Sequence, residues 1–297
     1  MLTVLIKVIL VKTMIDKNTF ARFVLTNDFS GRSVLTNEEF YSLESKFYNK
    51  DLSELETMPL WKIVDIVNDT ELAEKIYFAF KNADKTAFEK LSQNDILTLT
   101  NFDEFYPKTL SQKLKSDAPV LLYTLGNIDL LNQKSVAVIG SRKIDEKGRK
   151  FACDIGESIA KDGKILVSGG ANGSDFEATK SAIENGGKAV WFVAVPLQEI
   201  MRKRLVKEWI DNEKLLVCWD FNPFSSFQSK IALRRNKYIY ANAGSAFVCQ
   251  VNSKISGTFS GANYCLKHKL CELFVFDNDS DTAKTLIENG AIAIYER

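Results

Sequence analysis

The last two thirds of the chain alternate short apolar runs with amphipathic stretches. The apolar runs predict strands over 135–139, 164–168, 189–195, 215–219, 245–251, 272–276 and 291–295. Apolar positions recur with helical spacing over 146–161, 174–185, 199–210, 228–240, 258–267 and 281–289. Buried strands that alternate with helices are typical of a parallel sheet covered on both faces. With right-handed crossovers, the pattern predicts a doubly wound, mostly parallel α/β sheet.

The region before residue 100 has a different pattern, in which helical spacing is punctuated by capping sequences. Thr36–Glu39, Asn68–Glu71 and Ser92–Asp95 each precede an apolar run and each predict the start of a helix. A short apolar strand is expected after Pro119. The sequence therefore predicts a small all-helical module over 1–100 and an α/β domain over 101–297.

The first eleven residues are mostly apolar, but they are too short to span a membrane. Lys7 interrupts the run, no small-residue cleavage site follows it, and a membrane helix needs about 20 apolar residues. We expect residues 1–13 to form a leader, with Met14 as an alternative natural start. The expected location is the cytoplasm, without membrane association.

Composition excludes several classes of function. The chain has 297 residues, 45% of them hydrophobic and 26% charged, which is typical of a soluble globular protein. Its five cysteines show no CxxC spacing and predict buried thiols in a reducing compartment. His268 is the only histidine, which disfavours a histidine-based triad, metal site or general base. We expect no catalytic residue, no metal and no cofactor.

Two turns rich in glycine and serine follow predicted strands. Gly140, Ser141 and Arg142 follow the strand over 135–139. The second turn follows the strand over 164–168 and contributes the candidates Ser168, Gly169, Gly170, Asn172 and Gly173. Small residues at the carboxyl end of a strand let backbone amides approach a phosphate, and a guanidinium binds two of its oxygens at once. Asp175, in the first turn of the next helix, is interpreted either as a cap or as part of the site.

Ser256, Gly257 and Thr258 form a third junction of this kind, after the strand over 245–251. Carboxyl ends of parallel strands meet at one edge of a sheet. Three junctions at one edge could hold several phosphates in a row, whereas one mononucleotide needs fewer.

Acidic residues are missing from one long segment. Residues 221–271 contain no Asp or Glu, although about 6 or 7 are expected at the chain-wide frequency. The net charge of the chain is only +1, so positive potential is concentrated locally, as a polyanion groove requires. Aromatic residues in or beside the segment either stack on bases or pack in the core. The candidate ligand-binding residues here are Arg234, Arg235, Asn236, Lys237 and Lys254.

Together these motifs resemble the DNA-processing protein A (DprA/Smf) family over roughly residues 105–295. The resemblance is carried by Tyr106-Pro107, Ala118–Tyr123, Gly126-Asn127, Val136–Arg142, Ser168–Asp175, Gly186–Lys188, Arg234–Lys237, Ser256–Thr258 and Leu286–Ala291. It implies an extended Rossmann fold that binds single-stranded DNA, forms a homodimer and hands the strand to the RecA recombinase during natural transformation. The family is not known for catalysis. The resemblance places the DNA contacts on Gly140, Ser141, Arg142, the Ser168–Gly173 turn, Arg234, Arg235 and Lys254.

The chain departs from the family pattern at several positions. Thr179 stands where the family usually has histidine, and Gln250 stands where it usually has glutamate. Two other functions remain open. One is a small-nucleotide sensor or phosphoribohydrolase-like protein of the same superfamily, although Lys254–Thr258 lacks that group's glycines and prolines. The other is a protein-interaction scaffold that binds neither DNA nor nucleotides.

Overall fold

The computed structural model describes residues 16–26, 34–47, 51–227 and 229–295. The predicted leader over 1–13 lies outside these residues. Backbone contacts divide the chain into two compact units. The smaller unit comprises 1–106, 115–124 and 220–225, and the larger comprises 107–114, 125–219 and 226–297. The sequence-based division at residue 100 stays a prediction.

The smaller unit is built mainly from helices. They are α2 (Lys17–Thr26), α3 (Asn37–Lys46), α4 (Leu60–Val67), α5 (Thr70–Lys81) and α6 (Lys85–Gln93), with short 3-10 helices at Leu52–Glu56 and Lys115–Asp117. Two predicted helix starts are confirmed. Thr36 and Glu39 form a reciprocal capping box on α3, and Asp69 caps α5 through the amide of Leu72.

The third predicted helix start, at Ser92–Asp95, is wrong. Helix α6 ends there, because Asp95 adopts a left-handed backbone with φ 58° and turns the chain out of the helix. Strand β1 (Leu97–Thr100) follows and pairs antiparallel with β2 (Leu121–Gly126), the strand expected after Pro119. The first 100 residues are therefore not entirely helical.

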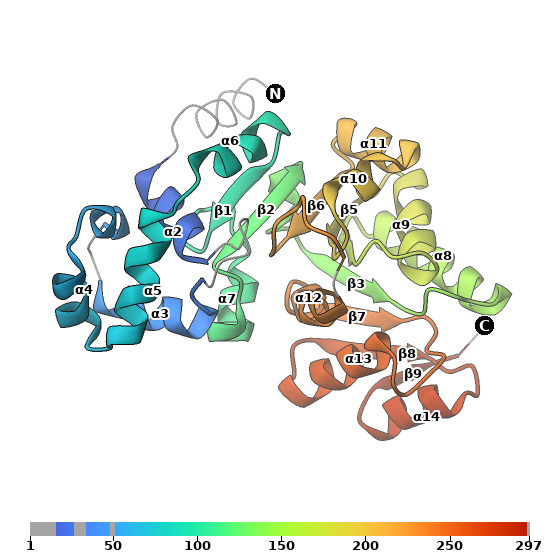
Figure 1. Ribbon diagram of the computed structural model, residues 1–297. Coiled ribbons are helices and arrows are strands. Elements are labelled where there is room, and N and C mark those ends of the chain that lie inside the picture. Colours follow the sequence, from blue (N-terminus) through green and yellow to red (C-terminus); the bar gives the residue numbers. More distant parts are fainter. Residues whose placement is uncertain (1–15, 27–33, 48–50, 228, 296–297) are drawn as a thin grey trace. The chain divides into compact units, whose positions relative to one another are not determined.

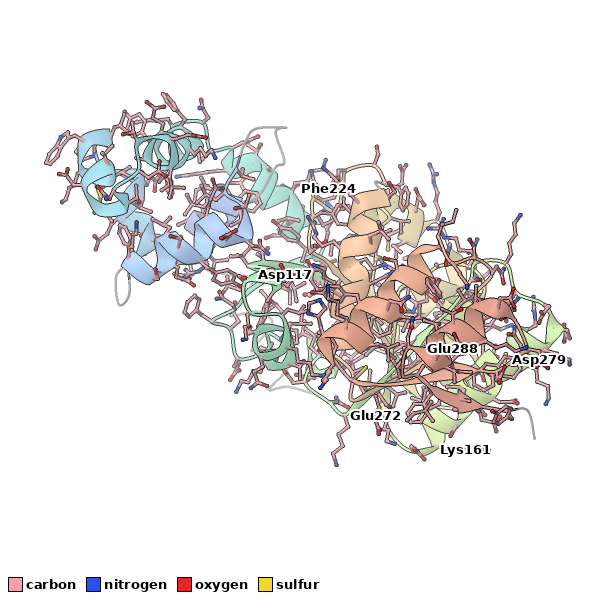
Figure 2. All side chains as sticks on the ribbon, turned by 90° about the horizontal axis from the view of Figure 1, so that it is seen from below. Asp117, Lys161, Phe224, Glu272, Asp279 and Glu288 are labelled. Atoms are coloured by element: carbon pink, nitrogen blue, oxygen red, sulfur yellow. The ribbon has the colours of Figure 1, made fainter. Side chains whose placement is uncertain are left out.

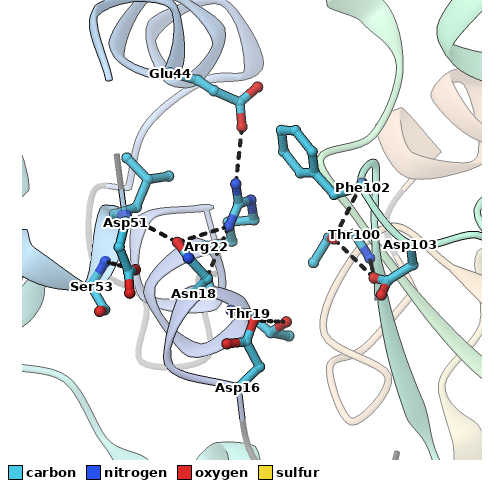
Figure 3. A network of polar contacts seen from close by, with 11 residues as sticks. Asp16, Asn18, Thr19, Arg22, Glu44, Asp51, Ser53, Thr100, Phe102 and Asp103 are labelled. Atoms are coloured by element: carbon cyan, nitrogen blue, oxygen red, sulfur yellow. Dashed lines mark hydrogen bonds and ion pairs between the residues drawn. The ribbon is translucent and has the colours of Figure 1, made fainter. Parts of the chain in front are cut away.

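A buried arginine ties the helices of the smaller unit together (Figure 3). Arg22 on α2 donates to Asn18 at 3.2 Å and forms an ion pair with Glu44 on α3 at 3.3 Å. Its guanidinium carbon lies 4.4 Å from the centre of the Phe102 ring. Burial raises the pKa of Glu44, and the charge of Arg22 offsets part of this increase. The network fixes α2 against α3 and the turn after β1.

The larger unit contains a parallel sheet (Figure 1). Its strands are β3 (Ser135–Ile139), β4 (Ile165–Ser168), β5 (Lys188–Phe192), β6 (Leu215–Trp219), β7 (Ser245–Val248), β8 (Glu272–Phe276) and β9 (Ile292–Ile294). The strand order is β6-β5-β4-β3-β7-β8-β9, and each neighbouring pair is parallel. Strands β4 to β6 extend from β3 to one side and β7 to β9 to the other, which confirms the doubly wound sheet.

The helices of the larger unit lie on both faces of this sheet. They are α7 (Lys108–Leu114), α8 (Glu146–Lys161), α9 (Ser174–Glu184), α10 (Leu197–Met201), α11 (Arg204–Asp211), α12 (Ser229–Ala241), α13 (Gly257–His268) and α14 (Asp281–Glu288), with a 3-10 turn at Ile128–Leu130. Successive residues of β5 show the two faces. The Trp191 side chain donates a hydrogen bond to the Thr179 hydroxyl on α9 at 2.8 Å. The Phe192 ring packs on Tyr238 of α12, with 6.1 Å between the ring centres.

Most helix predictions for the larger unit are confirmed to within two residues, with one exception. The single helix expected over 199–210 is two helices, because Lys203 is extended (φ −86°, ψ 98°) and begins α11 anew. Charged residues such as Lys161, Asp279 and Glu288 lie on the outside of this unit (Figure 2). In the part of the chain that the structure describes, every helix is too short or too polar to cross a membrane.

Candidate functional site

A cavity of about 490 Å³ lies at the carboxyl end of β3, between the turn that follows this strand, α12 and the start of α13. In the sheet, β3 is the neighbour of β7. The winding of the sheet reverses between these two strands, and ligands of open α/β sheets bind at such a position. The cavity is lined by Ile139, Gly140, Ser141, Arg142, Ala171, Asp175, Phe227, Ser229, Ala232, Leu233, Arg235, Asn236, Ser256, Gly257 and Thr258. Residues from the three predicted junctions and from α12 thus meet in one place.

Hydrogen bonds fasten the turn after β3 to the loop after β7. The amide of Ser141 donates to the Gln250 carbonyl at 2.9 Å, and the Ser141 hydroxyl accepts the amide of Asn252 at 3.1 Å. From α13, the Thr258 hydroxyl donates to the Gly140 carbonyl at 3.1 Å. Because both strand ends are held by the same bonds, the floor of the cavity is fixed in shape.

Asp175 organises the second turn from beneath the cavity. Its carboxylate accepts the amides of Gly140 at 3.3 Å, Gly169 at 3.2 Å and Ala171 at 3.4 Å. We expected the amides of these turns to point at a phosphate. Those of Gly140, Ser141 and Gly169 instead donate to internal acceptors, so these three amides are not directed at a ligand. In the sequence, the feature that could have indicated this arrangement is the carboxylate of Asp175, six residues after Gly169. A carboxylate that only caps a helix gives the same sequence pattern.

The ionisation of Asp175 is opposed by its surroundings. Burial raises the pKa of its carboxyl, and the charge of Arg235 together with the three amides offsets part of the increase. The side chain is 2% exposed. When Asp175 is ionised, Arg235 and the three main-chain amides offset its negative charge. This weakens the repulsion between Asp175 and an anionic ligand in the cavity.

Two glycines of the second turn are required by close approaches. A Cβ atom on Gly169 would lie 1.8 Å from Nη1 of Arg235, so the guanidinium occupies the space that a side chain would fill. Gly173 has φ +83°, and a Cβ there would lie 2.4 Å from the Ser141 carbonyl oxygen. These glycines bring the turns after β3 and β4 and helix α12 close together.

Positive charge enters the cavity from two arginines. Arg142 is exposed, and its guanidinium carbon lies 5.7 Å from the centre of the Phe227 ring. Arg235 comes from α12 and is 7% exposed. Asn236, next to it, donates to the Gly257 carbonyl at 3.1 Å and so holds α12 against the start of α13.

The start of α13 adds a third source of positive potential. The Ser256 hydroxyl accepts the amide of Phe259 at 3.2 Å, which occupies one of the first amides of the helix. The amides of Gly257 and Thr258 precede it in the first turn, where helical amides have no partner within the helix. Both residues line the cavity, so the helix dipole favours an anion there.

The structure separates the remaining candidates from the cavity lining. Ser168, Gly169, Gly170, Asn172 and Gly173 belong to the neighbouring turn; the Ser168 hydroxyl donates to the Val138 carbonyl, and only Asn172 is exposed. Arg234 is exposed elsewhere on α12, and the Lys237 ammonium lies over the Tyr264 ring at 4.7 Å. Lys254 lines a second cavity of about 550 Å³, together with Asp145 and Asp281.

The residues selected from the sequence as candidates do not include the apolar residues of the site. Phe227 and Leu233 line the cavity and are 41% and 50% exposed. Phe227 lies in the acid-free segment, where an aromatic residue is compatible with core packing as well.

The positions that differ from the family pattern have structural partners. The Thr179 hydroxyl accepts a hydrogen bond from the Trp191 side chain, and the Gln250 side chain accepts one from the amide of Asp145 at 3.1 Å.

Comparisons with known proteins agree with this architecture. The chain is 31% identical to the DNA processing protein DprA of Streptococcus pneumoniae over 192 residues, which are 63% of this chain and 64% of that protein. It is 27% identical to the protein Smf of Borreliella burgdorferi over 191 residues, which are 62% of this chain and 60% of that protein. The matched region therefore spans less than two thirds of the length of these relatives.

Two solved structures extend the comparison. The crystal structure of DprA from S. pneumoniae has a TM-score of 0.74 over 93% of this chain and 94% of that chain, at 24% identity, which shows a shared fold. DNA processing protein A from Helicobacter pylori, described for its single-stranded DNA binding mode, has a TM-score of 0.56 at 28% identity, over 68% of this chain and 91% of that one. The model of the DNA recombination-mediator protein A family matches residues 97–297, and the chain belongs to this family.

Proposed function

We propose that this chain binds single-stranded DNA in the cavity at the carboxyl end of β3, without catalysing a reaction on it. The observation that carries the proposal is the convergence of Arg142, Arg235 and the start of α13 on one cavity at the switch point of the sheet. A guanidinium and the amides of a helix start both favour a phosphate oxygen. The H. pylori relative, described for binding single-stranded DNA, supports the same ligand.

The apolar rim favours a single strand over a duplex. Phe227 and Leu233 expose apolar surface beside Arg142, and an aromatic ring can stack on any unpaired base. Bases in a duplex are already stacked and paired, so they cannot use this surface. We therefore expect Arg142 and α13 to contact the phosphates and Phe227 to contact a base, with little sequence preference.

The experiment is a fluorescence-anisotropy titration of a labelled dT oligomer at two salt concentrations. Arg142→Ala should weaken binding of all sequences by a similar factor and reduce the salt slope by about one, as expected for a phosphate contact. Lys161→Ala is the matched control, because it removes a positive charge at the far end of α8. Equal affinity of Arg142→Ala and wild type would remove this cavity as the DNA site.

A small nucleotide is the second candidate ligand. The volume of about 490 Å³ lies within the range of pockets that enclose one small molecule. Competition with AMP-class mononucleotides in the same titration separates the two. Tight nucleotide binding without oligomer binding would favour a sensor, and binding of neither would favour a protein-interaction scaffold.

The partners that the family resemblance implies are part of the proposal. We propose that the chain forms a homodimer in the cytoplasm and hands its strand to the RecA recombinase during DNA uptake. Light scattering of the purified chain tests the dimer. RecA filament formation on single-stranded DNA, with and without this chain, tests the handover.

A further inference from the structure

Two cysteines meet at the edge of the sheet opposite the DNA-binding cavity. Cys265 lies in the last turn of α13, and Cys271 immediately precedes β8. Their sulfur atoms are 3.7 Å apart. Lys269 turns the backbone with φ 50°, and the amide of Leu270 donates to the Cys265 carbonyl at 3.1 Å. The end of the helix therefore holds the two thiols side by side.

The surroundings of this pair stabilise negative charge on sulfur. A hydrogen bond from Cys271 lowers the pKa of Cys265, and the nearby Lys113 ammonium lowers it further. Lys113 is held in place by a hydrogen bond to the Ala243 carbonyl at 2.8 Å. The hydrogen bond between the two sulfur atoms raises the pKa of Cys271, so the negative charge of the pair lies on Cys265.

A buried hydroxyl close to the pair has no partner among the described residues. It belongs to Tyr240, whose side chain is fully buried and packs on Gly261, one turn before Cys265. Burial raises the pKa of Tyr240, and the negative charges of Cys265 and Cys271 raise it further. The hydroxyl of Tyr240 therefore stays protonated when the pair carries negative charge.

We propose that Cys265 and Cys271 form a redox-active dithiol that closes to an intramolecular disulfide on oxidation by hydrogen peroxide. Cys271 is the partly exposed member, so the oxidant meets its sulfur. As Cys271 attacks peroxide it passes its proton to the Cys265 thiolate, the O–O bond breaks, and Cys271 becomes a sulfenic acid with release of hydroxide. The Cys265 thiol then attacks that sulfur, the S–S bond forms and water leaves. The two thiols lose two electrons in total, and peroxide gains them.

Geometry separates this pair from the other three cysteines of the chain. Cys218 and Cys249 are fully buried, and burial raises the pKa of each thiol. Cys153 is partly exposed, but burial and Glu177 raise its pKa. Cys153 is therefore the internal comparator for accessibility without a neighbouring thiol.

The test is peroxide treatment of the folded full chain, followed by denaturation, alkylation with N-ethylmaleimide and mass spectrometry. We expect two of the five cysteines to escape alkylation, with a cross-linked peptide joining Cys265 to Cys271 that dithiothreitol removes. The pair should be oxidised faster than Cys153, because the pKa of Cys153 is raised by burial whereas a thiolate at Cys265 can accept the proton of Cys271.

Variants give an independent measurement. Cys265→Ser should leave Cys271 as a sulfenic acid that dimedone traps, and Cys153→Ser should leave disulfide formation unchanged. The wild-type peptide map does not depend on whether either variant folds. Alkylation of all five thiols after peroxide treatment, or oxidation of Cys153 at the rate of the pair, would overturn the proposal. The outcome is independent of DNA binding, which is measured separately with the reduced protein.

Discussion

Replacing Asp175 tests how the turns of the site are held together. The carboxylate accepts three main-chain amides and shares its charge with Arg235. In Asp175→Asn, the remaining oxygen can accept the amides of Gly169 and Ala171, but the new NH₂ group faces the amide of Gly140. One buried donor then lacks an acceptor, which costs about 1–3 kcal/mol of unfolding free energy. In Asp175→Ala all three amides lack an acceptor, and we expect a loss of roughly 3–5 kcal/mol.

The difference in unfolding free energy between the wild type and Asp175→Asn should depend on pH in a predictable direction. Because the pKa of Asp175 is raised in the folded chain, the folded state binds its proton more tightly than the unfolded state. Protonation therefore adds stability, which is fully present below the ordinary carboxyl pKa and is lost as the pH rises through the folded pKa. The asparagine variant has no such group. The advantage of the wild type over Asp175→Asn should grow on acidification from neutral pH.

Tryptophan fluorescence during thermal unfolding is the assay. Trp191, Trp209 and Trp219 are buried in the larger unit, so their emission reports its unfolding. Each kcal/mol corresponds to a shift of about 2–4 °C in melting temperature for a domain of this size. Asp154→Asn, an exposed carboxylate on α8, is the control and should change stability by less than about 0.5 kcal/mol. Wild-type stability in Asp175→Ala, or an advantage over Asp175→Asn that shrinks with acid, would refute the reasoning.

Two substitutions probe the walls of the cavity. Gly169→Ala places a Cβ 1.8 Å from Nη1 of Arg235, so it should displace that guanidinium, destabilise the fold by about 1–3 kcal/mol and weaken binding of the dT oligomer. Gly244→Ala, whose Cβ meets nothing closer than 3.7 Å, should leave anisotropy titrations and melting curves near those of wild type. Phe227→Ala should reduce oligomer affinity by about 1–3 kcal/mol through loss of a stacked base, whereas Phe78→Ala, at an even more exposed ring, should not. Unchanged affinity in Phe227→Ala would assign the ring to packing.

The fold was largely predictable because its strands and helices obey simple periodicity. Continuous apolar runs marked every parallel strand, and capping residues such as Thr36 and Asp69 marked helix starts. The errors fell where local patterns are ambiguous. The sequence around Asp95 has the polar composition of a helix start, but the left-handed backbone there ends a helix. The helix breaks at Lys203, although the amphipathic pattern over 199–210 is continuous in the sequence. A break of one residue leaves the spacing of the apolar positions nearly unchanged, so the pattern could not show it.

The site was predictable as a location and less so as a set of contacts. Strand-turn-helix junctions converge because parallel strands share an edge, which brought Gly140, Arg142 and Gly257 to one cavity. The acceptor of a given amide depends on tertiary structure. The sequence therefore could not show that the Asp175 carboxylate accepts a hydrogen bond from the amide of Gly169. Nor could it place Lys254 in a separate cavity from Arg142.

In this site the main-chain amides hold the turns in place, and side chains supply charge to the ligand. The two roles predict different effects of substitution. The amides of Gly140, Ser141 and Gly169 are committed to internal acceptors, so the turns form a rigid frame. Charge for a ligand then comes from Arg142, Arg235 and the dipole of α13, of which only Arg142 is an exposed side chain. Substitutions in the turns should alter stability first and binding second. Substitution of Arg142 should alter binding and its salt dependence while the fold stays intact, which separates the two roles by experiment.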